Sequence, residues 1–512
     1  MVQATNKRIA KNTIMLYSRM IFIMLVTLYT SRVILNALGV IDYGIHNVVG
    51  GVVLMMSFLN NSMASSTQRF LNFEMGRNNS TELKRVFSMS VNIHVIIAIV
   101  VFLLLETFGL WIVVTQLKIP TERMDAALWV FHFSVASLLI TIISVPYYAS
   151  IISNEKMTIF AFVGIAEAIL KLLIAFYIQK TNADRLKVYA VLLFVVTCVV
   201  QLMYLIYARN NFPESRYNYF WNSKLFKKLI SFASWNLFGS IAVVAKNQGV
   251  NVLLNVFFGP AINTARGIAI QVNSALTSFV TNFLTALRPQ IIKSYASDDI
   301  DFHLKLTFNG ARYSYFLLFI LSLPVLLETE TILKIWLKTV PDFTAIFVRL
   351  VIISALIDTL SSTLTASIQA TGKIKKYQSI VGFLHLSIFP LSYLFFRLDY
   401  SPESTYYITI VVYLIILIAR VGLVKKQIDF SIHNYFKSVV VKSFLVSIVS
   451  VAIPLVLMSF MNESFIRLLI IVTTSLIVTT GAIFLIGINN DERKVVKNIF
   501  LSKFGRKINE EY

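Results

Sequence analysis

Apolar stretches separated by short, basic segments run along the whole chain. A helix needs about 20 mainly apolar residues to cross a bilayer, and the sequence contains fourteen stretches of this kind. Their approximate limits are 13–35, 43–66, 88–115, 126–150, 157–178, 187–208, 229–256, 263–287, 309–332, 344–370, 377–397, 404–424, 439–460 and 465–488. The pattern predicts an all-α integral membrane protein. The first, second, seventh and eighth spans are too polar to face lipid all round, so we expect them to pack inside or line a cavity.

Composition supports a membrane protein and excludes several other classes. Of the 512 residues, 57% are hydrophobic and 14% are charged, which excludes a soluble enzyme with a large core. The net charge of +21 indicates the positive-inside bias rather than a nucleic-acid partner, because the basic residues lie mostly between apolar stretches. The single cysteine, Cys198, excludes an internal disulfide, and the six histidines lack the spacing of a metal site. We therefore expect no metal and no bound cofactor.

The lysines and arginines of the short loops predict the orientation. If the N-terminus is cytoplasmic, the cytoplasmic loops and tail hold 31 of the 46 basic residues and the outer loops hold 9. This ratio predicts that both termini are cytoplasmic, and it favours an even number of spans. The longest connection between spans is about 20 residues, so any chemistry must take place within the helix bundle.

An internal repeat relates the two halves of the chain at a nearly constant offset. Three matches keep this register: Val33–Asn36 with Val252–Asn255, Arg69 with Arg288, and Ala149–Ile151 with Ala366–Ile368. Parallel repeats of this kind are typical of transporters. The predicted organisation is an N-terminal lobe of six spans at 1–208, a cytoplasmic linker at 209–228, a C-terminal lobe of six spans at 229–424, and two further spans with a cytoplasmic tail at 425–512.

The opening stretch from Asn12 to Gly76 carries charges inside its apolar helix. It contains Arg19 and Arg32, is expected to turn between Asn36 and Gly44, and returns through a second polar helix. A charge at the centre of a bilayer costs about 3 kcal/mol on insertion scales. Such a residue needs a partner, a wet cavity or a reach to the interface, and a wet cavity that receives an anion is our interpretation here.

Polar side chains elsewhere share helix faces at about 100° per residue. Three faces stand out: Asn236, Ser240, Asn247 and Asn251 in the seventh span, Arg266, Asn273, Thr277 and Thr281 in the eighth, and Ser354, Asp358, Ser362, Thr365 and Gln369 in the tenth. Hydrogen bonds between helices explain the hydroxyl groups. They do not explain the cations at positions 19, 246 and 266. By contrast, Glu167 and Lys171 lie four residues apart and can neutralise each other.

We therefore predict a net-positive cavity between the two lobes. Its binding cations would be Arg19, Arg32, Lys246 and Arg266, and its polar lining would include Asn47, Asn247, Asn251 and Asn273. Amides and hydroxyls suit sugars, whereas cations suit phosphate, and the forked guanidinium of arginine suits it best. Arg32 could instead extend to the outer interface. Asp358 would either pair with a cation or bind a coupling proton or sodium ion.

The stretch Ser31-Arg-Val-Ile-Leu-Asn-Ala-Leu-Gly-Val-Ile-Asp-Tyr-Gly-Ile-His-Asn-Val-Val-Gly-Gly51, with Arg69-Phe-Leu-Asn-Phe-Glu-Met-Gly76, resembles the N-terminal signature of bacterial polysaccharide flippases. These are the Wzx-type O-antigen transporters of the MATE-like multidrug and oligosaccharidyl-lipid exporter superfamily. The signature covers mainly the part of the chain up to Ser80. It is specific for this branch of the superfamily but not for any one sugar.

The resemblance implies a function and a mechanism. The substrate would be an undecaprenyl-pyrophosphate-linked oligosaccharide, moved across the bacterial inner membrane for surface polysaccharide such as the O-antigen of lipopolysaccharide. The two lobes would alternate their access to a central cavity, and related lipid II flippases likewise place arginines in their first and eighth spans. Membrane lipids, a polysaccharide polymerase and its chain-length machinery are the implied partners.

Other classes fit the residues less well. A cation-coupled drug antiporter of the same fold tends to carry a carboxylate in its first span, which here has arginines and no acid. A polysaccharide polymerase or ligase usually needs a large periplasmic loop, and a glycosyltransferase needs an acidic metal-binding motif or a soluble domain. We therefore expect a protein that is not an enzyme. A non-transporting partner in polysaccharide assembly would leave the cationic cavity unexplained.

Overall fold

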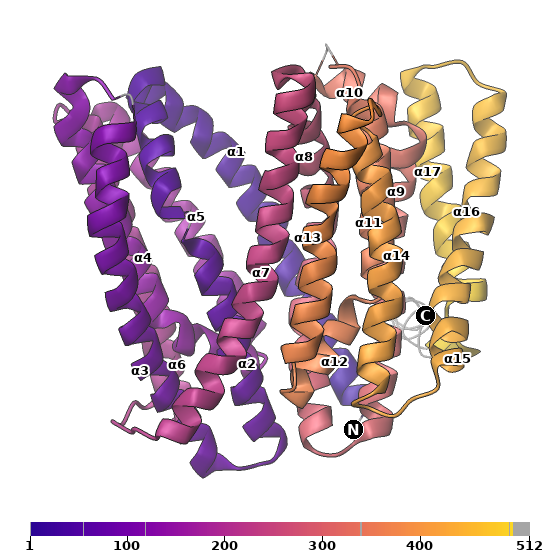
Figure 1. Cartoon of the computed structure of the whole chain (residues 1–512), viewed down its shortest axis with the longest axis horizontal. Helices are drawn as coiled ribbons and strands as arrows, with labels where there is room; N and C mark the ends of the chain where they lie inside the picture. Colours follow the sequence, from indigo (N-terminus) through magenta and orange to yellow (C-terminus); the bar gives the residue numbers. More distant parts are fainter. Residues whose placement is uncertain (1, 55, 118, 338–339, 491, 495–512) are drawn as a thin grey trace, which may run out of the picture. The chain divides into compact units, whose positions relative to one another are not determined.

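Helices make up the regular structure of the described chain (Figure 1). The computed structural model describes residues 2–54, 56–117, 119–337, 340–490 and 492–494, and the side chains of some further helical positions, Arg32 and Asn61 among them, lie outside the described residues. No strand occurs within these ranges. The all-α prediction is confirmed for the described part of the chain.

The α-helices are bounded as follows: α1 Val2–Leu54, α2 Ser57–Gly76, α3 Ser80–Leu104, α4 Met124–Ser153, α5 Met157–Lys180, α6 Arg185–Asn211, α7 Ser223–Phe258, α8 Pro260–Ala296, α9 Ile300–Leu327, α10 Thr329–Leu337, α11 Thr344–Thr359, α12 Ser362–Thr371, α13 Lys375–Arg397, α14 Ser404–Lys425, α15 Ile432–Tyr435, α16 Lys442–Ser459 and α17 Phe465–Ala482. Short π-helical turns extend α3, α16 and α17, and short 3-10 turns precede α4 and follow α6. Most predicted spans therefore correspond to one long helix each.

Eleven described helices are long and apolar enough to cross a membrane, or twelve if the bent pair 33–39 and 41–53 within α1 counts as one span. The predicted number of fourteen is not confirmed. The helices α2 and α8 are not apolar enough to count as membrane-crossing helices. The described apolar helix 12–27 is shorter than a membrane-crossing helix. For α2 and α8, which belong to the spans expected to be too polar to face lipid all round, polar side chains are the physical reason.

Contacts between Cα atoms divide the chain into two compact units. Unit 1 comprises residues 1–241, 285–303 and 366–382, and unit 2 comprises residues 242–284, 304–365 and 383–512. The division crosses helices, because α7 and α8 each contribute residues to both units. The predicted division into two lobes at the linker 209–228 stays a prediction. Each unit is described by itself below.

In unit 1 the central helix is α4, which packs against α2, α3 and α6, while α1 packs against α5. Val130 and Phe131 of α4 are fully buried and meet Val49 of α1 in one apolar cluster. Lipid tails are as apolar as these side chains, so close packing rather than transfer out of water holds such a core together.

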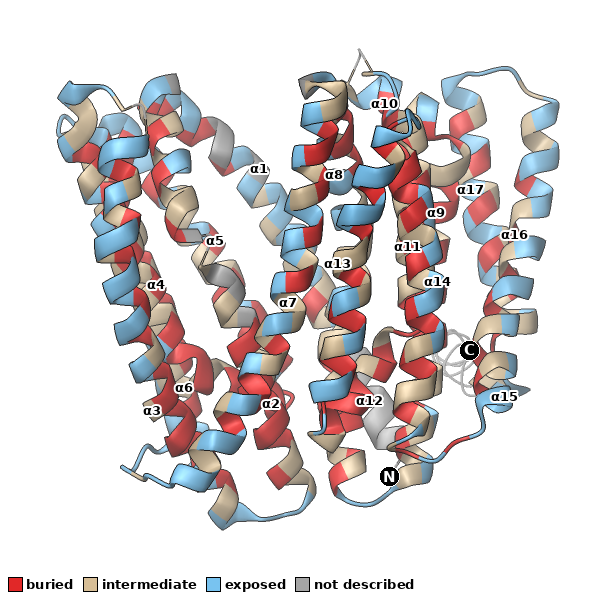
Figure 2. Ribbon diagram, viewed as in Figure 1, coloured by how far each residue is buried: buried red, intermediate tan, exposed pale blue. Residues whose placement is uncertain are grey.

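In unit 2 the helix α11 packs against α14, and α16 packs against α17. Figure 2 shows exposed residues along α16, and large apolar side chains such as Phe444 and Ile448 are among them. Two ion pairs connect α9 and the residue after it to the C-terminal part of the chain: Arg467 Nε lies 2.8 Å from Glu328 Oε1, and Arg312 Nη2 lies 2.7 Å from Glu492 Oε1. Glu328 and Arg312 are each 1% exposed. Their partners are needed because a buried charge without one is costly.

Residues with positive φ mark equivalent turns in the two halves of the chain. The paired positions are Gly39 and Gly259 (φ 79° and 82°), Asn78 and Asp298 (53° and 57°), and Glu155 and Gly372 (58° and 76°). The separation in sequence is nearly the same for all three pairs and is close to the predicted offset. Glycine adopts this conformation without steric cost, which explains why a glycine follows both copies of the Val33–Asn36 segment. The predicted turn between Asn36 and Gly44 is confirmed at Gly39, where the helical dihedral angles are interrupted.

Candidate functional site

Unit 2 contains a polar cavity of about 680 Å³. Its walls come from α7, α8, α11, the first residue of α12, α13 and α14, and every lining residue belongs to unit 2. Ligand sites in proteins commonly enclose about 300–1,000 Å³. The cavity is therefore large enough for the polar head of a ligand, with a long chain or further groups outside it.

The cavity brings together six of the nine residues that the sequence singled out. These are Lys246, Asn247, Asn251, Arg266, Asn273 and Asp358. The amides of Gln248 and Asn263 also belong to the lining, and hydroxyl groups make up the rest of its polar part: Ser274, Thr277, Thr281, Ser354, Thr359, Ser362, Thr405, Tyr406, Thr409 and Tyr413. The face predicted for α8 lies along this wall over its whole length. The face predicted for α7 is divided, because only Asn247 and Asn251 line the cavity.

Two cations of the lining are buried and contact only neutral oxygen atoms and aromatic rings in the described part of the chain. Arg266, 6% exposed, donates from Nη2 to the Asn247 carbonyl oxygen at 3.1 Å, and its Nε is buried with no hydrogen-bond partner. Lys246, 8% exposed, donates from Nζ to the Tyr413 hydroxyl at 3.1 Å. The Lys246 ammonium also lies 5.3 Å from the centre of the Tyr413 ring, and the Arg266 guanidinium lies 6.0 Å from that of Tyr406. Aromatic faces stabilise a cation without neutralising it.

The one carboxylate of the lining is neutralised by an arginine that the sequence analysis did not assign to the site. Arg420 of α14 lies with Nη1 2.6 Å from Asp358 Oδ1, and the same nitrogen donates to Ser361 Oγ at 3.0 Å. Arg420 lies near the end of its span, so the sequence grouped it with the cytoplasmic loop charges. A cation within the last helical turns of a span, facing an acid in another span, is the signal that could have found it. With this pair neutral, Lys246 and Arg266 leave the cavity net positive.

The remaining predicted site residues lie elsewhere. Arg19 belongs to unit 1, where its Cζ lies 4.1 Å from the centre of the Phe160 ring and its guanidinium lies against Gly164. Asn47 is exposed on α1. The side chain of Arg32 lies outside the described residues. Neither Arg19 nor Asn47 lines the cavity of unit 2. The binding role of all three residues stays a prediction.

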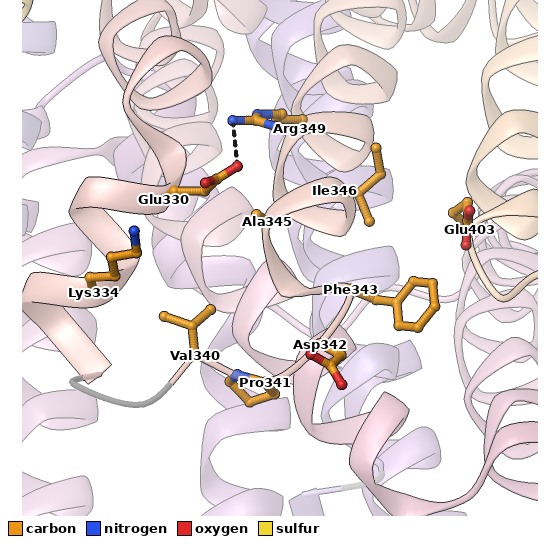
Figure 3. Close-up of a pocket in the computed structure, with 10 residues that line it drawn as sticks. All are labelled: Glu330, Lys334, Val340, Pro341, Asp342, Phe343, Ala345, Ile346, Arg349 and Glu403. Carbon is orange, nitrogen blue, oxygen red and sulfur yellow. Dashed lines mark hydrogen bonds and ion pairs between the residues drawn. The ribbon is translucent and has the colours of Figure 1, made fainter. Parts of the chain in front are cut away.

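Two other charged residues of the spans have acidic partners. Lys171 Nζ lies 2.6 Å from Glu167 Oε1, which confirms that pair. Arg349 of α11 lies 3.3 Å from Glu330 at a second pocket (Figure 3). That pocket also contains Lys334, Asp342 and Glu403. Its charges are of both signs, so it lacks the excess of positive charge found in the first cavity.

The comparisons with known proteins concern the fold. No family model matches the sequence, and no curated protein matches it. An outward-facing conformation of a multidrug resistance MATE family transporter of the MOP superfamily has a TM-score of 0.71 at 10% identity, covering 83% of this chain and 96% of that chain. A MOP superfamily transporter from Pyrococcus furiosus, described as having a binding pocket of reverse polarity, has a TM-score of 0.67 at 11% identity with the same coverage.

A mutant of the Vibrio cholerae MATE transporter VcmN has a TM-score of 0.66 at 16% identity, covering 85% of this chain and 99% of that chain. The TM-scores establish the fold. Identities this low leave the substrate open. The predicted MATE-like fold is confirmed, and the Wzx-type branch stays a prediction. The chain is an all-α, multi-pass membrane protein with the fold of the MATE and MOP transporters.

Proposed function

We propose that this protein is a flippase that moves an undecaprenyl-pyrophosphate-linked oligosaccharide from the cytoplasmic to the periplasmic leaflet of the bacterial inner membrane. The MATE-like fold supports transport as the activity. The resemblance of residues 31–51 and 69–76 to polysaccharide flippases supports this class of substrate. The observation that carries the proposal is the cavity, in which Lys246 and Arg266 are buried and form no ion pair with a carboxylate among the described residues.

The positions of the two cations suit a diphosphate. A buried cation in a membrane protein costs several kcal/mol unless a partner offsets it, and a bound diphosphate would supply that partner. Arg266 has a buried, unpartnered Nε beside an Nη2 that donates to a backbone carbonyl oxygen. This edge of the guanidinium can donate two parallel hydrogen bonds to phosphate oxygens. Lys246 would add a second positive charge on the neighbouring helix α7.

The neutral lining suits a sugar next to the diphosphate. The amides of Asn247, Asn251 and Asn273 offer both donors and acceptors, as sugar hydroxyls require. Hydroxyl groups of α8 and α14 extend this surface. A cavity of about 680 Å³ would hold the diphosphate and the first sugar, and the other sugars and the lipid would extend beyond it.

The charge of the cavity argues against the alternative of a drug antiporter coupled to a cation. Asp358 is the one carboxylate among the lining residues, and it already forms an ion pair with Arg420. A cationic drug would meet two cations and a neutralised acid. If transport is coupled to a proton or a sodium ion, binding of that ion at Asp358 would require the pair with Arg420 to open.

The proposed orientation in the membrane follows from the distribution of lysines and arginines among the loops. Both termini would be cytoplasmic, and the product would be delivered to polymerase and chain-length proteins on the other side of the inner membrane. The decisive experiment locates lipid-linked repeat units in a deletion strain. Accumulation of complete units on the cytoplasmic face, with loss of surface glycan, is the expected result. Unpolymerised or unligated units on the periplasmic face would instead support a polymerase or ligase and overturn the proposal.

A further inference from the structure

Two cations of unit 1 make matching contacts with the ends of helices in the opposite halves of the chain. Arg69, near the end of α2, donates from Nε to the Gln369 carbonyl oxygen at 3.0 Å and from Nη2 to the Ala370 carbonyl oxygen at 2.8 Å. Lys293, near the end of α8, donates from Nζ to the Ser153 carbonyl oxygen at 2.6 Å. Ser153 and Ala370 are equivalent positions of the repeat, and each precedes one of the equivalent turns.

Both contacts satisfy the same chemical need. The last carbonyl groups of a helix have no partner within the helix, and the helix dipole places partial negative charge there, which attracts a cation. Arg69 provides this cation for α12 and Lys293 provides it for α4. The first repeat thus caps a helix of the second repeat, and the second repeat caps a helix of the first.

The two contacts differ in one respect. Glu155, just after α4, accepts hydrogen bonds from Lys293 Nζ at 2.7 Å and Gln290 Nε2 at 2.6 Å through its Oε1 atom. The equivalent residue after α12 is Gly372. A Cβ there would lie 2.7 Å from Arg69 Nη2, so a larger residue would require the guanidinium to shift. One contact includes a salt bridge, and the other is made to backbone alone.

The side chains around these two contacts form a polar layer, in which several hydrogen-bonding groups have no partner. Ser62 Oγ of α2 lies 3.1 Å from Ser240 Oγ of α7, and Asn236 Oδ1 accepts from Gln378 Nε2 at 2.9 Å. Several buried atoms of this layer have no hydrogen-bond partner in the described part of the chain: Gln68 Nε2, Arg69 Nη1, both polar atoms of the Asn72 amide, Asn236 Nδ2 and Gln369 Oε1. Permanent interfaces bury few such groups. A layer of this kind is suited to a surface that becomes wet when the helices separate.

We infer that the contacts of Arg69 and Lys293 form a latch, which holds one end of the transport path closed and opens in each cycle. The contacts explain why residues 285–303 and 366–382 of the second repeat group with unit 1. The inference rests on the proposed function only in that it requires a transporter. On the predicted orientation the latch is at the cytoplasmic end, so it would have to open for the lipid-linked glycan to enter.

A reversible cross-link tests whether this interface opens. Cys198 is the single cysteine, so Cys198→Ser provides a background without other thiols. Ser62→Cys with Ser240→Cys joins α2 to α7 across the two repeats. We expect oxidation to reduce delivery of lipid-linked repeat units in membrane vesicles at least tenfold, and reduction to restore it. Full delivery by the cross-linked protein, or failure of this pair to cross-link, would overturn the latch.

The matched control joins two serines that lie equally close within the first half of the chain. Ser150 Oγ and Ser215 Oγ are 2.9 Å apart, on α4 and on the short turn 213–215. The pair Ser150→Cys and Ser215→Cys should cross-link without loss of delivery. A loss equal to that of the first pair would mean that the cross-link itself, and not closure of the interface, stops transport.

A second measurement does not depend on transport. With Ser62→Cys as the reporter, Arg69→Ala with Lys293→Ala should increase labelling by a membrane-impermeant maleimide several-fold, and Glu155→Gln should give a smaller increase. Lys334→Ala, which removes a surface cation of unit 2, is the control and should change nothing. Unchanged labelling in a folded double variant would refute the latch whatever the substrate is. Increased labelling without any delivery of lipid-linked units in the unmutated protein would refute the proposed function alone.

Discussion

Asp358 and Arg420 form an ion pair of 2.6 Å at the wall of the cavity, although α11 and α14 place them 62 residues apart in the sequence. The Asp358 carboxylate is partly exposed to the cavity, whereas Arg420 is buried. The pair therefore stabilises the arginine and removes the negative charge that would otherwise compete with an anionic ligand. It leaves Lys246 and Arg266 as the charges that a substrate meets.

We expect Asp358→Asn to destabilise the protein by about 1–3 kcal/mol, because Arg420 would remain buried without its carboxylate. Adding Arg420→Gln should recover a large part of this loss, since two neutral groups can share a hydrogen bond. Thermal unfolding in detergent measures the three variants against the parent protein. Losses that simply add in the double variant would show that the two side chains do not depend on each other.

Arg266→Ala should reduce surface polysaccharide and delivery of lipid-linked units about 10- to 100-fold, which corresponds to about 1.5–3 kcal/mol for a charge-assisted hydrogen bond. Arg266→Lys should recover part of the activity, because a lysine keeps the charge but lacks the fork. The control is Arg349→Ala, which removes an arginine of the second pocket. Equal losses in Arg266→Ala and Arg349→Ala would argue against a specific anion site.

Gly164→Ala should destabilise unit 1 by about 1–3 kcal/mol through overpacking. A Cβ at Gly164 would lie 2.9 Å from Arg19 Cζ, so the guanidinium must leave the Phe160 ring. In an Arg19→Ala background the same glycine substitution should cost little, because the space is then free. A double-mutant cycle of thermal stabilities measures this coupling, and a glycine effect that does not depend on Arg19 would contradict the packing described here.

Acid should weaken the cluster in which Arg123 contacts Asp42 and Asp184. Burial acts to raise the pKa of Asp184, but hydrogen bonds from Arg123 and from the backbone N–H groups of Lys187 and Leu186 outweigh it and hold the pKa below its usual value. A carboxyl with a depressed pKa stabilises the fold fully above its unfolded pKa of about 3.9, and this contribution is lost as pH falls through the lower, folded value.

The corresponding variant is Asp184→Asn, which keeps a side chain able to cap α6. We expect it to lower stability by about 1 kcal/mol at pH 7, since the group is partly exposed. The difference from the parent protein should shrink as pH falls below the unfolded pKa of about 3.9. Thermal unfolding between pH 3 and 7 provides the measurement. A difference that stays constant over this range would assign the effect to capping and not to charge.

Local features of the fold were predictable because each depends on a short stretch of chain. The length of the apolar stretches predicts helices, and the glycines at 39 and 259 predict turns that the structure has at both positions. The pair Glu167–Lys171 was predictable for the same reason, since one helical turn separates the two residues. The number of membrane-crossing helices was less predictable. Both α2 and α8 are long enough to cross a membrane, but their polar side chains leave open whether they do.

The sequence by itself determined an all-helical membrane protein with two related halves and with cations placed inside its spans. The polar faces of α7 and α8 also follow from helical periodicity alone. Only the tertiary structure decided which charges meet: it placed Lys246 and Arg266 in one cavity, paired Asp358 with Arg420, and set Arg19 against Phe160. The physical reason is that helical periodicity fixes the face of each helix, whereas the helices packed against that face come from distant parts of the chain.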